Sequence, residues 1–75
     1  MWIHKTSVGT LKIKYDSKVK KYALLLNDEC SGYYSSPEAA ADDVYTQHSG
    51  FDEIDNLPSD EIDDFSNNLG SWEEV

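Results

Sequence analysis

The chain contains no arginine, a single cysteine and no glycine-rich run, and each of these shortages excludes or weakens one kind of binding site. Without arginine, the commonest bidentate contact with guanine bases cannot form. Because Cys30 is the only cysteine, the chain has neither an intrachain disulfide nor a cysteine-based zinc cluster. The four glycines are isolated from one another, so no phosphate-binding loop is present.

Long apolar runs are also missing. The longest, residues 22–26, is far too short to cross a bilayer, so we expect no membrane partner. The amino terminus lacks the charged-then-apolar pattern of a secretion signal, which favours a cytoplasmic protein. A chain of 75 residues forms one small domain, which buries about 60–65% of its unfolded surface.

Residue patterns that carry catalysis or bind metal are absent as well. His4, His48 and Cys30 lie far apart in the sequence, without the paired spacing of zinc ligands. The acidic runs 52–55 and 60–64 lack the central glycine of a calcium-binding loop. No motif places a general base beside a serine or the cysteine. We therefore expect no catalytic residue, no metal and no cofactor, and we interpret the protein as a non-enzyme.

The charge that is present is divided along the chain. All six basic residues are lysines between Lys5 and Lys21, whereas fourteen of the fifteen carboxylates follow them, and the net charge is −9. Two arrangements follow from this division. Either the acidic tail folds over the lysines, which we favour because arginine is missing, or the two charges occupy opposite faces of one domain.

Alternation of apolar and polar residues predicts strands at 2–6, 10–15, 22–26 and 30–35. In the second of these, Leu11 and Ile13 face one way, and Lys12 and Lys14 face the other. Short turn sequences separate the strands, which predicts an antiparallel meander. Gly32 indicates a bulge or a close backbone approach in the fourth strand.

The following segment has the signals of a helix. Ser36 suits the N-cap and Pro37 suits the first helical position, before a run of three alanines. Ala40, Ala41 and Val44 begin an apolar face that continues to His48. We expect the helix to cover about residues 37–49, with a left-handed C-cap near position 50.

The rest of the chain is acidic with regularly spaced apolar residues. Phe51, Ile54 and Leu57 suit one helical turn that docks on the core. Ser59 can cap a second short helix through about residue 68, followed by an irregular end. The apolar stripe along this part either packs on the second sheet face beside Trp2 or binds another chain. Its members are Ile62, Phe65, Leu69 and Trp72.

The predicted fold class is α+β. A three- or four-stranded antiparallel β-meander packs on one α-helix, and short acidic C-terminal helices follow. Residues 1–57 form the sheet-plus-helix core, and residues 58–75 form an acidic amphipathic tail of the same domain.

Residues 22–26 and 32–40, which read YALLL and GYYSSPEAA, resemble the AP2-like and integrase arm-type DNA-binding modules. The resemblance covers about residues 10–50 and implies a three-stranded antiparallel sheet packed on one helix. In that family the sheet face enters the major groove through arginine and tryptophan. The corresponding strand here offers Lys12 and Lys14 instead, and the acidic tail is foreign to the family pattern.

The leading functional hypothesis is a protein that binds a basic protein partner through an acidic surface, as a DNA mimic does by imitating phosphates. Acidic composition that serves solubility alone is the ordinary alternative. The residues of the predicted acidic contact surface are Asp52, Glu53, Asp55, Asp60, Glu61, Asp63, Asp64, Phe65 and Trp72.

The alternative hypothesis is a nucleic-acid-binding module that uses a lysine-bearing sheet face. Its residues are Lys5, Lys12, Lys14, Lys20 and Lys21. The same lysines also suit a solvated face that discourages edge pairing between strands. For the oligomeric state we expect a monomer or a weak homodimer formed through a tail helix.

Overall fold

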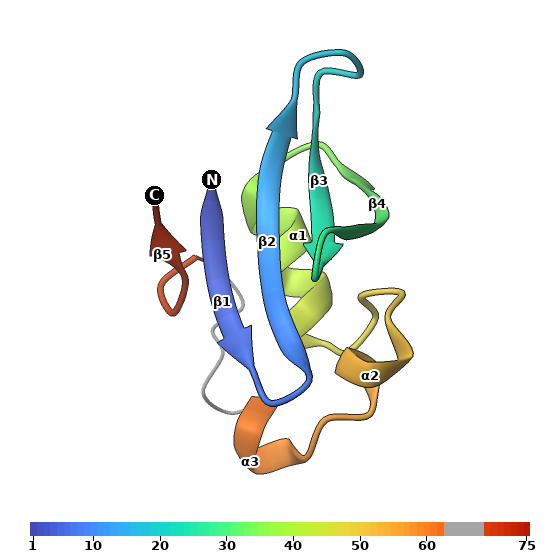
Figure 1. Ribbon diagram of the computed structural model, residues 1–75, viewed down its shortest axis with the longest axis vertical. Helices are drawn as coiled ribbons and strands as arrows, with labels where there is room; N and C mark the ends of the chain where they lie inside the picture. Colours follow the sequence, from blue (N-terminus) through green and yellow to red (C-terminus); the bar gives the residue numbers. More distant parts are fainter. Residues whose placement is uncertain (63–68) are drawn as a thin grey trace.

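The structure is a computed structural model, and it describes residues 1–62 and 69–75. A five-stranded antiparallel sheet, in the order β4-β3-β2-β1-β5, packs against one main helix, which confirms the predicted α+β class (Figure 1). The strands are β1 (Trp2–Thr6), β2 (Gly9–Asp16), β3 (Lys21–Leu26), β4 (Glu29–Tyr34) and β5 (Glu73–Glu74). The helices are α1 (Pro37–Tyr45), α2 (Asp52–Asp55) and α3 (Ser59–Ile62).

The first four strands form the predicted meander, because each connection between them is a short turn. Asn27 and Asp28 both have positive φ, 50° and 70°, as a two-residue hairpin turn between twisted strands requires. The longer turn from β2 to β3 closes when the backbone N–H of Lys20 donates to the Asp16 carbonyl at 2.8 Å. The predicted irregularity near Gly32 is confirmed, since Leu24 pairs with Gly32 but Leu25 pairs with Cys30.

The register of the strands assigns residues to the two faces of the sheet, because directly paired residues point to the same side. Leu11 pairs with Leu26 and Ile13 pairs with Leu24, and all four are buried. They form the core together with α1, α2 and Trp72. The buried apolar residues of that cluster are Leu11, Ile13, Leu24, Leu26, Ala40, Ala41, Val44, Phe51, Ile54, Leu57 and Trp72.

Helix α1 begins as its sequence predicts. Ser36 is the N-cap, its hydroxyl accepts from the backbone N–H of Ala39 at 3.2 Å, and Pro37 opens the first turn. The buried face consists of small side chains, so the helix lies close to β2, β3 and β4. The predicted end near residue 49 is wrong, because the helix stops at Tyr45 and Gln47 takes a left-handed φ of 61°.

The polar side chain of Gln47 explains the early end of α1. Its amide nitrogen donates to the backbone carbonyls of Asp55 at 3.0 Å, Leu57 at 3.2 Å and Ile54 at 3.4 Å. These bonds hold α2 beside the end of α1 and supply a donor to the carbonyls of Asp55 and Leu57, whereas the Ile54 carbonyl also accepts from the backbone N–H of Leu57 at 3.1 Å. His48 therefore lies beyond the helix and is exposed, in contrast to the predicted apolar face.

The acidic segment joins the same core. Ile54 is fully buried and Phe51 and Leu57 are buried beside it, which confirms the predicted docking of one helical turn. Helix α3 begins at Ser59, as predicted, and the rest of the predicted helix lies outside the described residues. The predicted irregular end is wrong at β5, where Glu73 pairs with Ile3 and adds a fifth strand.

Candidate functional site

The side of the sheet opposite α1 carries a surface that mixes lysines with apolar residues. The register places Lys12 opposite both Ile3 and Leu25, and places Lys14 opposite Ala23. On β4, Tyr33 lies opposite Ala23. We call this surface the open face, and its residues are Ile3, Lys5, Lys12, Lys14, Ala23, Leu25, Cys30 and Tyr33.

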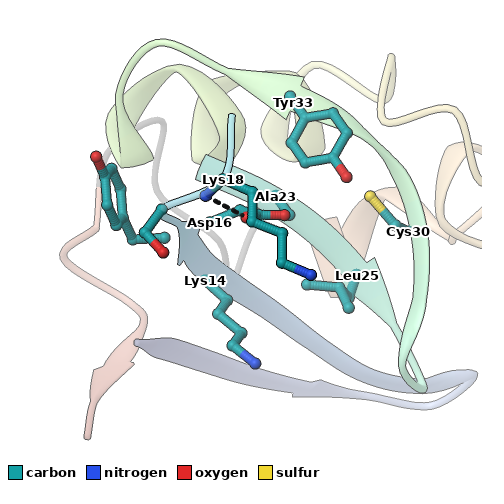
Figure 2. A pocket seen from close by; sticks show the side chains of 9 residues that line it. Lys14, Asp16, Lys18, Ala23, Leu25, Cys30 and Tyr33 are labelled. Carbon is teal, nitrogen blue, oxygen red and sulfur yellow. Dashed lines mark hydrogen bonds between the residues drawn. The ribbon is translucent and has the colours of Figure 1, made fainter. Parts of the chain in front are cut away.

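The open face is hollowed at one end. A hollow of about 380 Å³ is lined by β2, β3, β4 and the turn after β2, and no helix contributes to its lining. Figure 2 shows Tyr33 and Cys30 on the β4 side of this hollow and Lys14 on the β2 side. Ala23 and Leu25 lie between them, and the Tyr33 ring is 49% exposed. The hollow therefore combines an apolar floor with two exposed aromatic residues, Tyr33 and Tyr15, and its edge mixes two lysines with the Asp16 carboxylate.

Three carboxylates lie close to the lysines of the open face, and two of them have partners within the chain. Asp28 accepts an ion-paired hydrogen bond from the Lys12 ammonium at 3.1 Å, with the side chains 80% and 30% exposed. Asp16 accepts from the backbone N–H of Lys18 at 2.9 Å inside the turn. Glu73 pairs with Ile3 at the β5 edge. Among residues 1–62 and 69–75, Lys12–Asp28 is the one ion pair within 4.0 Å.

The predicted nucleic-acid-binding lysines do not all share one surface. Lys5, Lys12 and Lys14 lie on the open face. Lys21, which pairs with Asp16 at the start of β3, points to the same side as Ala23 and Lys14, whereas Lys20 has a left-handed φ of 56° in the exposed turn. The sequence reasoning did not select the lining residues Lys18, Ala23, Leu25 and Tyr33. Alternation within β3 and β4 was the signal that could have placed Ala23, Leu25 and Tyr33 on the same side of the sheet.

The predicted acidic surface is distributed over short helices. Asp52, Glu53 and Asp60 are exposed. Asp55 is half-buried and accepts from both the backbone N–H and the hydroxyl of Ser49, at 2.9 and 2.8 Å. Glu61 accepts from the Ser7 hydroxyl at 3.1 Å. The other acidic residues of that prediction, Asp63 and Asp64, lie outside the described residues, as does Phe65.

Trp72 does not belong to an exposed contact surface, and its assignment to one is wrong. The side chain is 7% exposed in the core and meets the His4 ring edge-on at 5.5 Å between centroids. Pairing of β5 with β1 brings Trp72 over the sheet. It packs near Trp2, as one reading of the sequence expected, but on the face that carries α1.

A second tyrosine joins the sheet to the helix layer. Burial raises the pKa of the Tyr34 phenol well above that of an ordinary tyrosine, and the hydrogen bond with Asp43 raises it further. The negative charges of Asp43 and Asp55 act in the same direction. The Tyr34 phenol is therefore held neutral beside Asp43, where β4 meets α1.

The described residues separate the two charges of the chain. The exposed carboxylates of α1 and α2 lie on the helix-bearing side, and Lys5, Lys12 and Lys14 lie on the open face. This is the arrangement with charges on opposite faces, rather than a tail that covers the lysines.

None of the described helices is long and apolar enough to span a membrane. In the same part of the chain, no three histidine, cysteine or acidic side chains gather as metal ligands would.

Comparison of the chain with protein families, with curated proteins and with solved structures finds no match.

Proposed function

We propose that this protein is a non-enzymatic nucleic-acid-binding module that contacts its ligand through the open face. The observation that carries the proposal is the strand register, which gathers Lys5, Lys12 and Lys14 around an accessible apolar surface. Ammonium groups that neutralise phosphates release counterions, and this release supplies most of the affinity of sequence-independent binding. The DNA-binding modules that residues 10–50 resemble use the corresponding side of their sheet.

The net charge of −9 does not prevent an anionic ligand from reaching this surface. The exposed carboxylates of α1 and α2 lie across the sheet from the open face, and the shortest dimension of the molecule is 19 Å. At physiological ionic strength the Debye length is about 8 Å, so solvent ions screen charges over that separation. The local field at the open face is then set by its own lysines together with the neighbouring carboxylates Asp16, Asp28 and Glu73.

The test is a fluorescence anisotropy titration of labelled oligonucleotides at low and increasing salt. We expect binding that weakens steeply with salt. Lys14→Gln removes one phosphate contact, so it should weaken binding and reduce the slope of log K against log salt by about 0.7–0.9. The matched control is His48→Glu, which lowers the net charge by the same amount from an exposed position after α1. It should leave that slope unchanged.

Absence of binding at low salt would contradict the proposal. Equal effects of Lys14→Gln and His48→Glu would also contradict it, because they would mean that total charge and not the open face governs affinity.

A second candidate function is binding of a basic protein partner through the helix-bearing side. It is favoured by the exposure of Asp42, Asp52 and Glu53 on that side and of Asp60 on the neighbouring α3. Immobilised protein should then capture a basic partner, and the charge reversals Asp52→Lys and Asp60→Lys should abolish capture. The control Glu73→Lys reverses one charge opposite Ile3, on the open face, and should not abolish capture. Capture that survives the first pair of reversals would exclude the acidic surface.

For the oligomeric state, a monomer or a weak homodimer remains the prediction. Sedimentation equilibrium over a wide concentration range distinguishes them, because a homodimer gives an apparent mass that rises with concentration.

A further inference from the structure

We infer that the open face takes single-stranded nucleic acid, with one unpaired base held in the hollow against Tyr33; this inference rests on the proposed function. It specifies the strandedness of the ligand and the residue that would recognise a base, which the arrangement of lysines alone does not do.

The size and lining of the hollow suit a base. Its volume of about 380 Å³ lies at the small end of the range for small-molecule sites, about 300–1,000 Å³. Ala23 and Leu25 provide an apolar floor, and the half-exposed ring of Tyr33 provides a surface for stacking (Figure 2). Stacking on an aromatic side chain tolerates any base, because every base has a flat π-face.

The charges at the edge of the hollow suit the phosphates on either side of that base. Lys14 lies across the hollow from Tyr33, and Lys18 lies in the turn that closes one end. The carboxylate at this edge, Asp16, already accepts the Lys18 backbone N–H at 2.9 Å. An extended strand can therefore place its base in the apolar part and its phosphates near the two ammonium groups.

A duplex fits this surface less well. Its bases are stacked on one another, so none can present a π-face to Tyr33 without being unpaired first. The chain also lacks arginine, which makes the commonest base contact in the major groove. Both observations favour an unpaired strand over a double helix.

The first experiment compares oligomers that carry the same number of phosphates. The probes are an oligothymidylate of about ten nucleotides, the matching oligouridylate, a deoxyribose-phosphate oligomer without bases, and a hairpin duplex. We expect the single strands with bases to bind more tightly than the other two probes. The thymidylate and uridylate arms distinguish DNA from RNA as the preferred strand.

The second experiment tests the base in the hollow. Tyr33→Ala should weaken oligothymidylate binding roughly tenfold, the size of one lost stacking contact, and should barely affect the oligomer without bases. Tyr33→Phe keeps the ring and should restore most of the affinity. Circular dichroism of both variants controls for folding.

Cys30 provides a readout on the unaltered protein. It is the single cysteine of the chain, its thiol is exposed, and it lines the hollow beside Tyr33. Saturating oligothymidylate should slow its alkylation by iodoacetamide, and the oligomer without bases at saturation should not.

The outcomes separate this inference from the function on which it rests. If the hairpin or the oligomer without bases binds as tightly as oligothymidylate, and Cys30 remains unprotected, the inference is overturned while nucleic-acid binding stands. If none of the four probes binds at low salt, the proposed function itself fails. Protection of Cys30 together with the loss in Tyr33→Ala supports the inference.

Discussion

Tyr33 and Tyr34 are adjacent in the sequence, and the alternation of β4 gives them different environments. The Tyr33 ring is exposed on the open face, and Tyr34 points to the helix-bearing side, where its phenol meets Asp43. The sequence predicts their opposite directions, because neighbouring residues of a strand point to opposite faces. It does not predict that Asp43, nine positions away, becomes the partner of the second tyrosine.

Tyr34 should give the folded protein a distinctive alkaline titration. Its pKa is raised in the folded state by burial and Asp43, so unfolding makes the phenol easier to ionise. The resulting contribution to stability is fully present below the unfolded pKa of about 10 and is lost as the pH rises through the folded value. Absorbance titration of the folded protein should show a tyrosine that ionises well above pH 10.

The substitution Tyr34→Phe should remove that late ionisation step, and Tyr33→Phe should retain it. A late step that persists in Tyr34→Phe would show that another tyrosine, and not Tyr34, produces it.

Neutralising Asp28 should strengthen nucleic-acid binding. Asp28→Asn releases Lys12 from its ion pair, and asparagine tolerates the φ of 70° at this turn position. Exposed ion pairs are worth about 0.2–1 kcal/mol, so we expect binding to become about 1.4- to fivefold tighter. Anisotropy titrations measure the change. Asp42→Asn on α1 removes the same charge from the other side, and an equal gain in that variant would contradict the role of the open face.

At the scale of elements, the strands and the start of α1 could be predicted because their signals are local. Alternation defines β2, and the Ser36–Pro37 pair defines the helix start. The end of α1 could not be predicted in this way. The left-handed C-cap is predicted near Gly50, but the helix ends earlier and Gln47 has the left-handed conformation there. The reason is that the Gln47 side chain binds backbone carbonyls in and just after α2.

The junction of α1 and α2 should therefore depend on Gln47. Gln47→Ala loses the side-chain hydrogen bonds and keeps an unfavourable positive φ, so it should destabilise the protein by about 1–2 kcal/mol. Gln47→Gly loses the same bonds but relieves the backbone, and should cost about 0.5–1 kcal/mol less than alanine. Urea denaturation measures both. In an ordinary helix, glycine is less stable than alanine. If Gln47→Gly were less stable than Gln47→Ala, the left-handed geometry at this position would be contradicted.

Strand β5 illustrates a second limit of prediction at this scale. Two residues carry no periodic pattern, and the sequence around Glu73 and Glu74 is typical of an irregular acidic end. The strand forms because the edge of β1 offers unpaired backbone groups and burial of Trp72 brings the chain there. Such pairing depends on tertiary contacts rather than on local propensity.

At the scale of the whole molecule, the separation of charge predicts that salt has opposite effects on stability and on binding. A net charge of −9 repels itself in the compact state, so added salt should raise the midpoint of thermal unfolding. The same salt should weaken nucleic-acid binding at the open face. Thermal denaturation and anisotropy, each from about 20 to 200 mM sodium chloride, measure the two trends. If added salt raised both the unfolding midpoint and the binding affinity, or lowered both, the local action of the lysines would be contradicted.

The sequence by itself determined the secondary elements of the core, the division of charge and the absence of arginine. These properties are written in neighbouring residues and in composition. The tertiary structure alone decided that the carboxylates of α1 and α2 lie across the sheet from the open-face lysines and that Trp72 is buried. It also decided that Lys14, Ala23 and Tyr33 meet across three strands. The physical reason is that a face of a sheet is assembled by register between strands, and register depends on turns, bulges and packing beyond any single strand.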